Sequence, residues 1–91
     1  MTPPIYRGLF RKERIIVGFL CDTNRINQDG IIYPVENVQQ FVKKDIYDRD
    51  VYTGDKVLLD GEELTVNYNA KLMQFCAGDK PIYRYTSIIL L

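Results

Sequence analysis

Short apolar runs separated by polar turns dominate the chain, and this pattern predicts strands rather than helices. β-Branched and aromatic residues, which favour extended backbone, are concentrated in residues 5–10 and 14–21. Similar runs cover residues 31–33, 56–59, 62–68, 71–77, 82–85 and 86–91. We therefore expect about seven or eight antiparallel strands with little helix, an all-β class built as a small, partly open barrel or sandwich.

Residues 14–21 form the most continuously apolar segment, with the sequence Arg-Ile-Ile-Val-Gly-Phe-Leu-Cys. A strand with one face in water alternates apolar and polar residues, and this segment does not. We expect it to be the most buried strand, either central in its sheet or beneath a partner. Gly8, inside the preceding run, predicts a bulge or a close backbone approach.

Turn residues mark most of the connections between these runs. Asp60-Gly61 lies between two strand runs and predicts a type I′ hairpin turn. The polar composition of residues 22–30 predicts a loop, and the charges within residues 43–50 predict a surface segment anchored by Ile46 or Tyr47. Residues 35–41 leave two structures open, a strand or a single turn of helix, because helical spacing and β-branched content disagree.

Length and composition narrow the class of protein. The chain of 91 residues and 10.6 kDa accommodates a single domain, residues 1–91. Its small core favours oligomerisation as a further source of stability. There is no histidine, which removes the usual general base, the commonest metal ligand and the conventional catalytic triads. We therefore expect a binding protein and not an enzyme.

Charge is balanced over the whole chain but is unevenly distributed. Twelve basic and twelve acidic residues give a net charge of zero, which argues against nucleic acid as a partner. Residues 1–14 nevertheless hold four basic and one acidic residue, whereas residues 22–63 hold five basic and ten acidic residues. A basic, aromatic start set against an acidic middle is an asymmetry that a binding protein uses.

Neither a metal nor a cofactor is expected. Cys21 and Cys76 belong to no paired-ligand spacing such as C-x-x-C, and both are expected to be small core hydrophobes. No apolar run reaches the roughly 20 residues that cross a bilayer, so no membrane contact is expected. Thr2, Pro3 and Pro4 follow Met1 without the pattern of a signal peptide, which predicts a cytoplasmic protein.

Several short segments carry the pattern of a known family. They are Tyr6-Arg7-Gly8, Gly18-Phe19-Leu20, Val38-Gln39-Gln40-Phe41 through Lys44-Asp45, and Val51-Tyr52-Thr53-Gly54-Asp55-Lys56-Val57. In these segments the chain resembles the YopX-like proteins of phages and prophages. That family has an early Arg and aromatic strand, then V-G-Q-[FY]-T-G-L-x-D, then Y-x-G-D-x-V. Here Gln39 replaces a usual glycine, Val42-Lys43-Lys44 replaces the Thr-Gly-Leu step, and the early Trp is absent.

The resemblance has implications for both fold and context. It implies a predominantly β fold with a small barrel-like core, which agrees with the strand pattern. It also implies a phage or prophage accessory protein that is expressed in the cytoplasm of a bacterial host cell. No catalytic residues carry over from the family.

Arginine and tyrosine pairs are the candidate ligand contacts. Guanidinium groups bind phosphate oxygens, and aromatic rings stack under a base. The competing interpretation is that these side chains are exposed strand residues that balance the acidic middle of the chain. The candidate ligand-binding residues are Tyr6, Arg7, Arg11, Arg14, Tyr83, Arg84 and Tyr85.

The end of the chain is a candidate interface. Four consecutive apolar residues in a strand place two on each face, so one pair faces water unless both faces are covered. The strand is therefore expected to be central or to lie in a subunit interface, formed by Ile88, Ile89, Leu90 and Leu91.

Acidic residues offer weaker candidates. Asp45, Asp48 and Asp50 resemble the start of a calcium loop, but the glycine and the distal glutamate of that loop are missing. We therefore interpret them as solvated charges.

Three binding functions follow. The first is a homo-oligomeric, phage-encoded counter-defence protein that sequesters a small nucleotide-derived host immune signal at subunit interfaces, since so small a chain is expected to make a pocket only by sharing it. The second is a protein–protein module that inhibits a bacterial defence or replication complex through its acidic middle segment. The third is a small barrel that binds single-stranded nucleic acid through the basic N-terminal residues.

Overall fold

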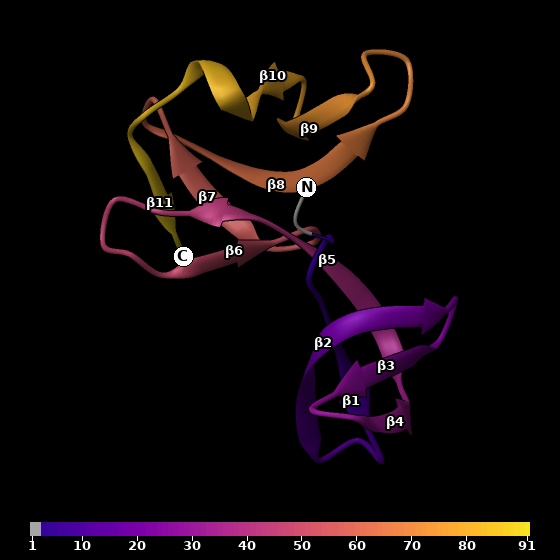
Figure 1. Ribbon diagram of the computed structural model, residues 1–91. Coiled ribbons are helices and arrows are strands. Elements are labelled where there is room, and N and C mark those ends of the chain that lie inside the picture. Colours follow the sequence, from indigo (N-terminus) through magenta and orange to yellow (C-terminus); the bar gives the residue numbers. More distant parts are fainter. Residues whose placement is uncertain (1–2) are drawn as a thin grey trace. The chain divides into compact units, whose positions relative to one another are not determined.

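The computed structural model describes residues 3–91, which form short strands and one 3-10 helix (Figure 1). The backbone divides into two compact units, an N-terminal unit that ends at Phe41 and a C-terminal unit, Val42–Leu91. Each unit has its own buried cluster and is described by itself. The elements are β1 (Tyr6–Phe10), β2 (Arg14–Asp22), β3 (Arg25–Gln28), β4 (Ile31–Pro34), β5 (Glu36–Lys44), β6 (Asp50–Tyr52), β7 (Lys56–Leu59), β8 (Glu62–Asn69), β9 (Gln74–Ala77), β10 (Lys80–Pro81), η1 (Ile82–Arg84) and β11 (Ile88–Leu90).

Strand pairing confirms the all-β, antiparallel class. One sheet has the order β4-β3-β2-β1-β5-β6 and the other has the order β10-β9-β8-β7-β11. Both sheets have two ends in the described chain, so neither closes into a barrel. The strand β5 begins in the N-terminal unit, and its last residues belong to the C-terminal unit. Residues 35–41, for which two structures were open, are mainly strand.

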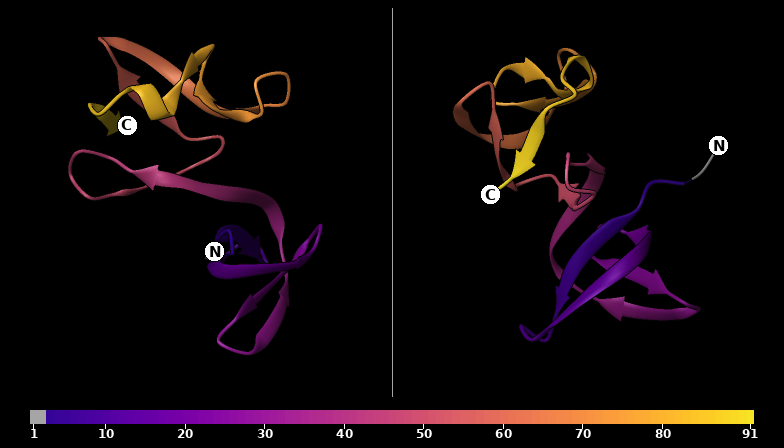
Figure 2. Two further views of the ribbon diagram at one scale, coloured as in Figure 1. Left: turned by 45° about the horizontal axis from the view of Figure 1, so that its top comes forward. Right: turned by 90° about the vertical axis from the view of Figure 1, so that its left-hand side faces the viewer.

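The N-terminal unit is a meander that winds around a small core. The hairpins β2-β3 and β3-β4 follow one another along the chain (Figures 1 and 2). β2 lies between β1 and β3, which confirms the prediction that it is central. The centre of the core is formed by three buried residues, Ile16, Ile26 and Val35. Five partly buried side chains pack against them, namely Tyr6, Phe10, Leu20, Tyr33 and Val38.

Only one face of β2 is buried, which corrects the prediction that β2 is the most buried strand. Ile16 is fully buried, but Ile15, Val17 and Phe19 are 56%, 39% and 50% exposed. Successive residues of a strand point to opposite faces, and the core of this unit lies on the face of Ile16. The continuous apolar sequence of β2 therefore leaves an apolar face outside the core of its own unit.

Gly8 allows β1 to approach the core closely. The pairing of β1 with β5 shifts register between Arg7 and Leu9, which is the bulge that the sequence predicts. A Cβ atom on Gly8 would lie 2.6 Å from the Cβ of Val35, a residue at the centre of the core. The prediction of a bulge or a close approach is confirmed on both counts.

The strand β3 was missed by the sequence prediction, which assigned residues 22–30 to a loop. Ile26 is its one apolar residue and is fully buried, whereas the other three are polar. Four residues with a single apolar position produce no alternation to detect. The pairing of β3 with β2 and with β4 fixes its extended conformation.

Three turns of the described chain place two consecutive residues at positive φ, and one has an unusual sequence. Asp29-Gly30 has φ values of 52° and 87°. Asp60-Gly61 has φ values of 51° and 79°. Both pairs are as expected of a type I′ turn. The prediction for residues 60–61 is confirmed. Arg11-Lys12, between β1 and β2, has φ values of 53° and 62°. Left-handed backbone costs about 1–2 kcal/mol for a residue with a side chain, so this turn is strained.

The C-terminal unit is built around the hairpins β7-β8 and β8-β9, with β11 paired to β7. Its core is larger than that of the N-terminal unit and draws on nearly every element. The buried residues are Val51, Val57, Leu59, Val66, Ala77, Ile82 and Ile88. Residues 82–84, predicted as strand, form the 3-10 helix η1 instead. Ile82 is 2% exposed, and the Tyr85 N–H donates to the Ile82 C=O at 3.0 Å.

The loop between β5 and β6 satisfies the outer edge of β11. The Ile46 N–H donates to the Ile88 C=O at 3.1 Å, and the Leu90 N–H donates to Asp45 Oδ2 at 3.0 Å. Arg49 Nη2 donates to the Leu90 C=O at 2.8 Å. β11 is thus an edge strand in the sheet order, but side chains and backbone of this loop occupy the polar groups of its outer edge.

Asp45 anchors this loop, which corrects two predictions. The side chain of Asp45 is fully buried, whereas Ile46 and Tyr47, the expected anchors, are 46% and 65% exposed. Asp45 is also not a solvated charge. Its Oδ1 accepts from the N–H groups of Tyr47 and Arg49, each at 2.9 Å, and its Oδ2 accepts from Arg49 Nε at 2.9 Å. Burial alone would raise the pKa of Asp45, but hydrogen bonds from Leu90, Arg49 and Tyr47 outweigh it and lower that pKa.

Candidate functional site

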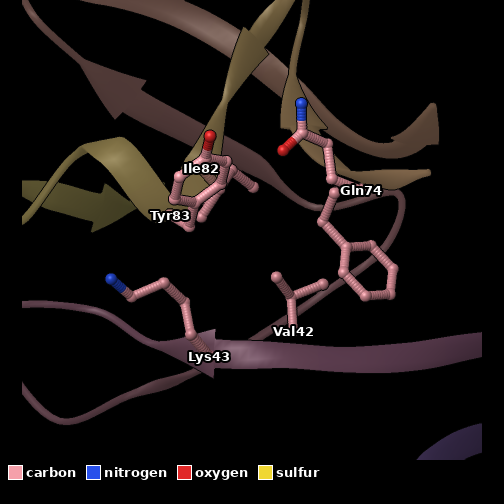
Figure 3. A pocket seen from close by; sticks show the side chains of 6 residues that line it. Val42, Lys43, Gln74, Ile82 and Tyr83 are labelled. Carbon is pink, nitrogen blue, oxygen red and sulfur yellow. The ribbon is translucent and has the colours of Figure 1, made fainter. Parts of the chain in front are cut away.

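A pocket of about 460 Å³ opens within the C-terminal unit (Figure 3). This volume lies in the range of about 300–1,000 Å³ that is typical of small-molecule sites. The pocket is lined by Val42, Lys43, Gln74, Phe75, Ile82 and Tyr83. All of these residues belong to the C-terminal unit. The sequence predicts a ligand pocket that is shared between subunits, whereas the lining of this pocket comes from one chain.

Three elements supply the walls of the pocket. Figure 3 shows the side chains from β5 on one side of the opening and those from η1 on the opposite side. The third wall comes from the start of β9. β5 supplies Val42 and Lys43, η1 supplies Ile82 and Tyr83, and β9 supplies Gln74 and Phe75.

Much of the lining is apolar or aromatic and is held in place by neighbouring side chains. Ile82 belongs to the buried core, and Val42 and Phe75 pack against that core. The ring of Phe75 meets the ring of Tyr68 edge to face, with centroids 5.3 Å apart and planes at 76°. Such a contact restrains the Phe75 ring. Tyr83 is 67% exposed and lies at the rim.

One cation, Lys43, lines the pocket, and a second, Arg84, is bonded to the lining residue Tyr83. Lys43 Nζ donates to the Tyr85 C=O at 3.4 Å, which keeps the ammonium group beside η1. Arg84 Nε donates to the Tyr83 hydroxyl at 3.2 Å, and its Cζ lies 5.7 Å from the centroid of the Tyr83 ring. The hydrogen bond to Tyr83 raises the pKa of Arg84 further above its ordinary value of 12.5. Like any arginine, Arg84 is charged at physiological pH.

Neither of these cations has a carboxylate partner in the part of the chain that the structure describes. Five other basic side chains do have one, and the pairs are Arg25 with Asp22, Lys44 with Asp50, Arg49 with Asp45, Lys56 with Glu63 and Lys80 with Glu62. The pocket therefore combines aromatic surface with positive charge that no acidic residue of the described chain pairs with. This combination suits an anion that carries an aromatic ring.

The structure divides the seven predicted ligand-binding residues between the two units. Tyr83 lines the pocket, Arg84 is bonded to Tyr83, and Tyr85 accepts the hydrogen bond of Lys43. The other four lie in the N-terminal unit. Tyr6 packs against its core, and Arg7 Nε donates to Gln39 Oε1 at 2.9 Å. Arg11 lies in the strained turn, and Arg14 begins β2 after it.

Five lining residues escaped the sequence prediction. Lys43 belongs to a charged segment that was assigned to the surface, and only the fold shows that it faces η1. Gln74, Phe75 and Ile82 lie in runs whose apolar residues indicated core. A usable signal was the change from apolar to charged residues at Val42 and Lys43, which marks a partly covered strand end.

The predicted interface residues have unequal environments. Ile88 is fully buried in the core of its own unit, and Leu90 packs against that core. Leu91 is 60% exposed, and Ile89 is half-buried. Pairing with β7 on one side, and the loop anchored by Asp45 on the other, occupy the two edges of this strand. A subunit interface at these residues stays a prediction.

The remaining candidates are the two cysteines and the acidic residues between β5 and β6. Cys76 is buried as predicted, but Cys21 is exposed, and both are free. Asp50 pairs with Lys44 at 2.7 Å, and Asp45 accepts hydrogen bonds from its own loop. Within residues 3–91 no three His, Cys, Asp or Glu side chains come together as metal ligands.

The described chain contains no helix that is both long and apolar enough to cross a bilayer. Comparison of the chain with models of protein families, with curated proteins and with solved structures finds no match. The similarity to the YopX-like proteins thus rests on the short segments of the sequence alone.

Proposed function

We propose that this chain is a binding protein for a small nucleotide-like anion and that the pocket of the C-terminal unit is its site. The observation that carries the proposal is the pairing of aromatic walls with two cations that have no carboxylate partner among the described residues. A purely apolar ligand would leave these charges unused. A purely ionic ligand would leave the aromatic surface exposed to water.

Each part of a nucleotide has a matching group in the pocket. The rings of Tyr83 and Phe75 offer surface on which a base packs. Lys43 is the lining residue that binds phosphate oxygens, and Arg84 adds a second positive charge at the rim. The amide of Gln74 both donates and accepts hydrogen bonds, as the edge of a base requires.

The wider role that we propose is sequestration. The sequence resemblance suggests a phage accessory protein, and removing a nucleotide-derived immune signal from a bacterial host needs tight binding rather than catalysis. The absence of histidine agrees with this role. Homo-oligomer formation through Ile89 and Leu91 belongs to the same proposal. Light scattering of the purified protein tests it, because a dimer or larger species supports the interface and a monomer contradicts it.

The second function, a protein–protein module acting through the acidic middle segment, has less support. Two of the three carboxylates that it would use are engaged within the chain, Asp45 by its loop and Asp50 by Lys44. Asp48 is then the member of this group that is left for a partner. The nucleotide pocket has more support, because aromatic side chains and two cations lie together there.

Calorimetric titration tests the proposal with four probes: AMP, cyclic di-AMP, adenosine and ribose 5-phosphate. We expect AMP or cyclic di-AMP to bind, and we expect adenosine and ribose 5-phosphate each to bind about tenfold more weakly, because each lacks one of the two recognised parts. The variant Lys43→Met keeps the apolar stem and removes the charge. It should weaken nucleotide binding by about tenfold.

The matched control is Lys71→Met, which removes an exposed lysine that does not line the pocket. It should leave the affinity unchanged. Failure of both nucleotides to bind, or equal binding of adenosine and AMP, would contradict the proposed ligand class. Full affinity in Lys43→Met would contradict the proposed site.

A further inference from the structure

The turn of the β1–β2 hairpin is strained, whereas the other two turns that place two consecutive residues at positive φ are not. Those turns use Asp-Gly, which tolerates left-handed backbone at little cost, whereas this turn uses Arg11-Lys12. A strained turn persists where its side chains have a function that compensates for the loss of stability. The two basic side chains, rather than the turn geometry, therefore account for the choice of residues.

Aromatic rings hold the arginines of this hairpin. The Cζ of Arg11 lies 5.0 Å from the centroid of the Phe10 ring, and the Cζ of Arg14 lies 5.3 Å from that of Tyr33. The two rings brace each other edge to face, 5.1 Å apart at 71°. Arg14 is fixed further because its Nη2 donates to Gln28 Oε1 at 3.2 Å. The result is a pair of guanidinium groups positioned by a pair of rings.

These cations are exposed, and no acidic side chain of the described residues forms an ion pair with them. Arg11, Lys12 and Arg14 are all exposed, and within residues 3–91 none of them forms an ion pair. Arg25 of the same unit shows the contrast, since Asp22 neutralises it. Glu13 is the one acidic residue between Phe10 and Arg14. The tip of the hairpin is thus locally positive in a chain whose net charge is zero.

Three adjacent cations suit an extended polyanion better than a single phosphate group. Guanidinium groups held over rings also present surface on which an unstacked base packs, and only single strands offer such bases. From this geometry we propose that the hairpin tip, defined as Phe10, Arg11, Lys12, Arg14 and Tyr33, binds single-stranded nucleic acid. This function is separate from the nucleotide pocket. The whole-chain charge argued against such a partner because it averaged this tip with the acidic middle of the sequence.

Fluorescence anisotropy with a labelled oligo(dT) of about 15 nucleotides tests the proposal. Three phosphate contacts predict that log K falls against log salt concentration with a slope of about −2. The double variant Arg11→Asn/Lys12→Gly installs a favourable type I′ sequence. It should raise the Tm by about 5 °C, because it relieves strain. It should also weaken binding by about tenfold at about 50 mM salt and reduce the slope to about −0.7.

The rise in Tm shows that any loss of binding is not a loss of folding. Lys71→Ala is the matched control, since it removes an exposed lysine that also has no ion pair in the described part of the chain, and it should bind oligo(dT) like the parent protein. Equal affinity of the double variant would overturn the proposal. So would equally strong competition by polyglutamate, which would assign the tip to an acidic protein partner, or tighter binding of a duplex.

Discussion

Replacement of Gly18 by alanine is expected to lower the free energy of unfolding by about 3 kcal/mol. A Cβ atom on Gly18 would lie 2.1 Å from the backbone oxygen of Asn27 and 2.9 Å from its carbonyl carbon. A flexible side chain would move aside, but these atoms belong to β3, which pairs with β2 at this point. The added methyl group must therefore push the two strands apart, and the burial of Ile26 depends on that pairing.

Urea denaturation followed by circular dichroism measures the loss, and amide hydrogen exchange locates it. Exchange should accelerate first at the amides that β2 and β3 share. The control is Gly30→Asn in the same unit, because space around Gly30 is open and asparagine tolerates its positive φ. The control should retain nearly all of the stability. A Gly18→Ala protein as stable as this control would show that β2 and β3 do not pair as described.

Replacement of Asp45 by asparagine is expected to lower the Tm by about 10 °C. The carboxylate accepts from the N–H groups of Tyr47, Arg49 and Leu90 and also from the Arg49 guanidinium. An amide offers one acceptor oxygen instead of two, and its NH₂ group would face donors. The loop would then lose its hold on the outer edge of β11, and hydrogen exchange at Leu90 should become faster.

The same variant predicts a change in the pH dependence of stability. The folded state lowers the pKa of Asp45 below its ordinary value of 3.8. As the pH falls below about 4, the unfolded chain takes up the proton first, so the stabilisation by Asp45 is complete above about pH 5 and is lost in acid. Asparagine does not titrate. The difference in Tm between the parent and Asp45→Asn should therefore shrink as the pH is lowered from about 5 to below 4.

Asp48→Asn is the control for both measurements. Asp48 lies in the same loop, is exposed and has a positive φ that asparagine tolerates. Its replacement should change neither the Tm nor the pH profile appreciably. If Asp48→Asn and Asp45→Asn were equally stable, the buried carboxylate would not be the anchor of the loop.

The sequence predicted the class of fold because its signals are local. Apolar runs with turn residues between them mark strands such as β7 and β8, and Asp60-Gly61 marks the turn that joins them. The strand β3 and the helix η1 escaped because partners define them. One is held between β2 and β4, and the other follows Pro81 and is fixed by the burial of Ile82.

The candidate site was predicted only in part, for a related reason. Tyr83, Arg84 and Tyr85 form an aromatic and basic group that is visible in the sequence. Lys43 joins them through a hydrogen bond that spans 42 residues, and no local pattern encodes such a contact. The burial of Asp45 was hidden in the same way, because its partner Leu90 lies 45 residues further along the chain.

That long-range contact of Asp45 also sets an order for events during synthesis. Every strand pairing among β1 to β4 joins consecutive strands, so these hairpins can form as soon as they leave the ribosome. The C-terminal unit cannot complete its core in this way, because Ile88 and the Leu90 amide that binds Asp45 are made after all the other residues of that core. Until then Asp45 is a solvated carboxylate and the β7 edge is unpaired. The nascent chain therefore passes through an interval in which an apolar edge strand is open to association with other chains.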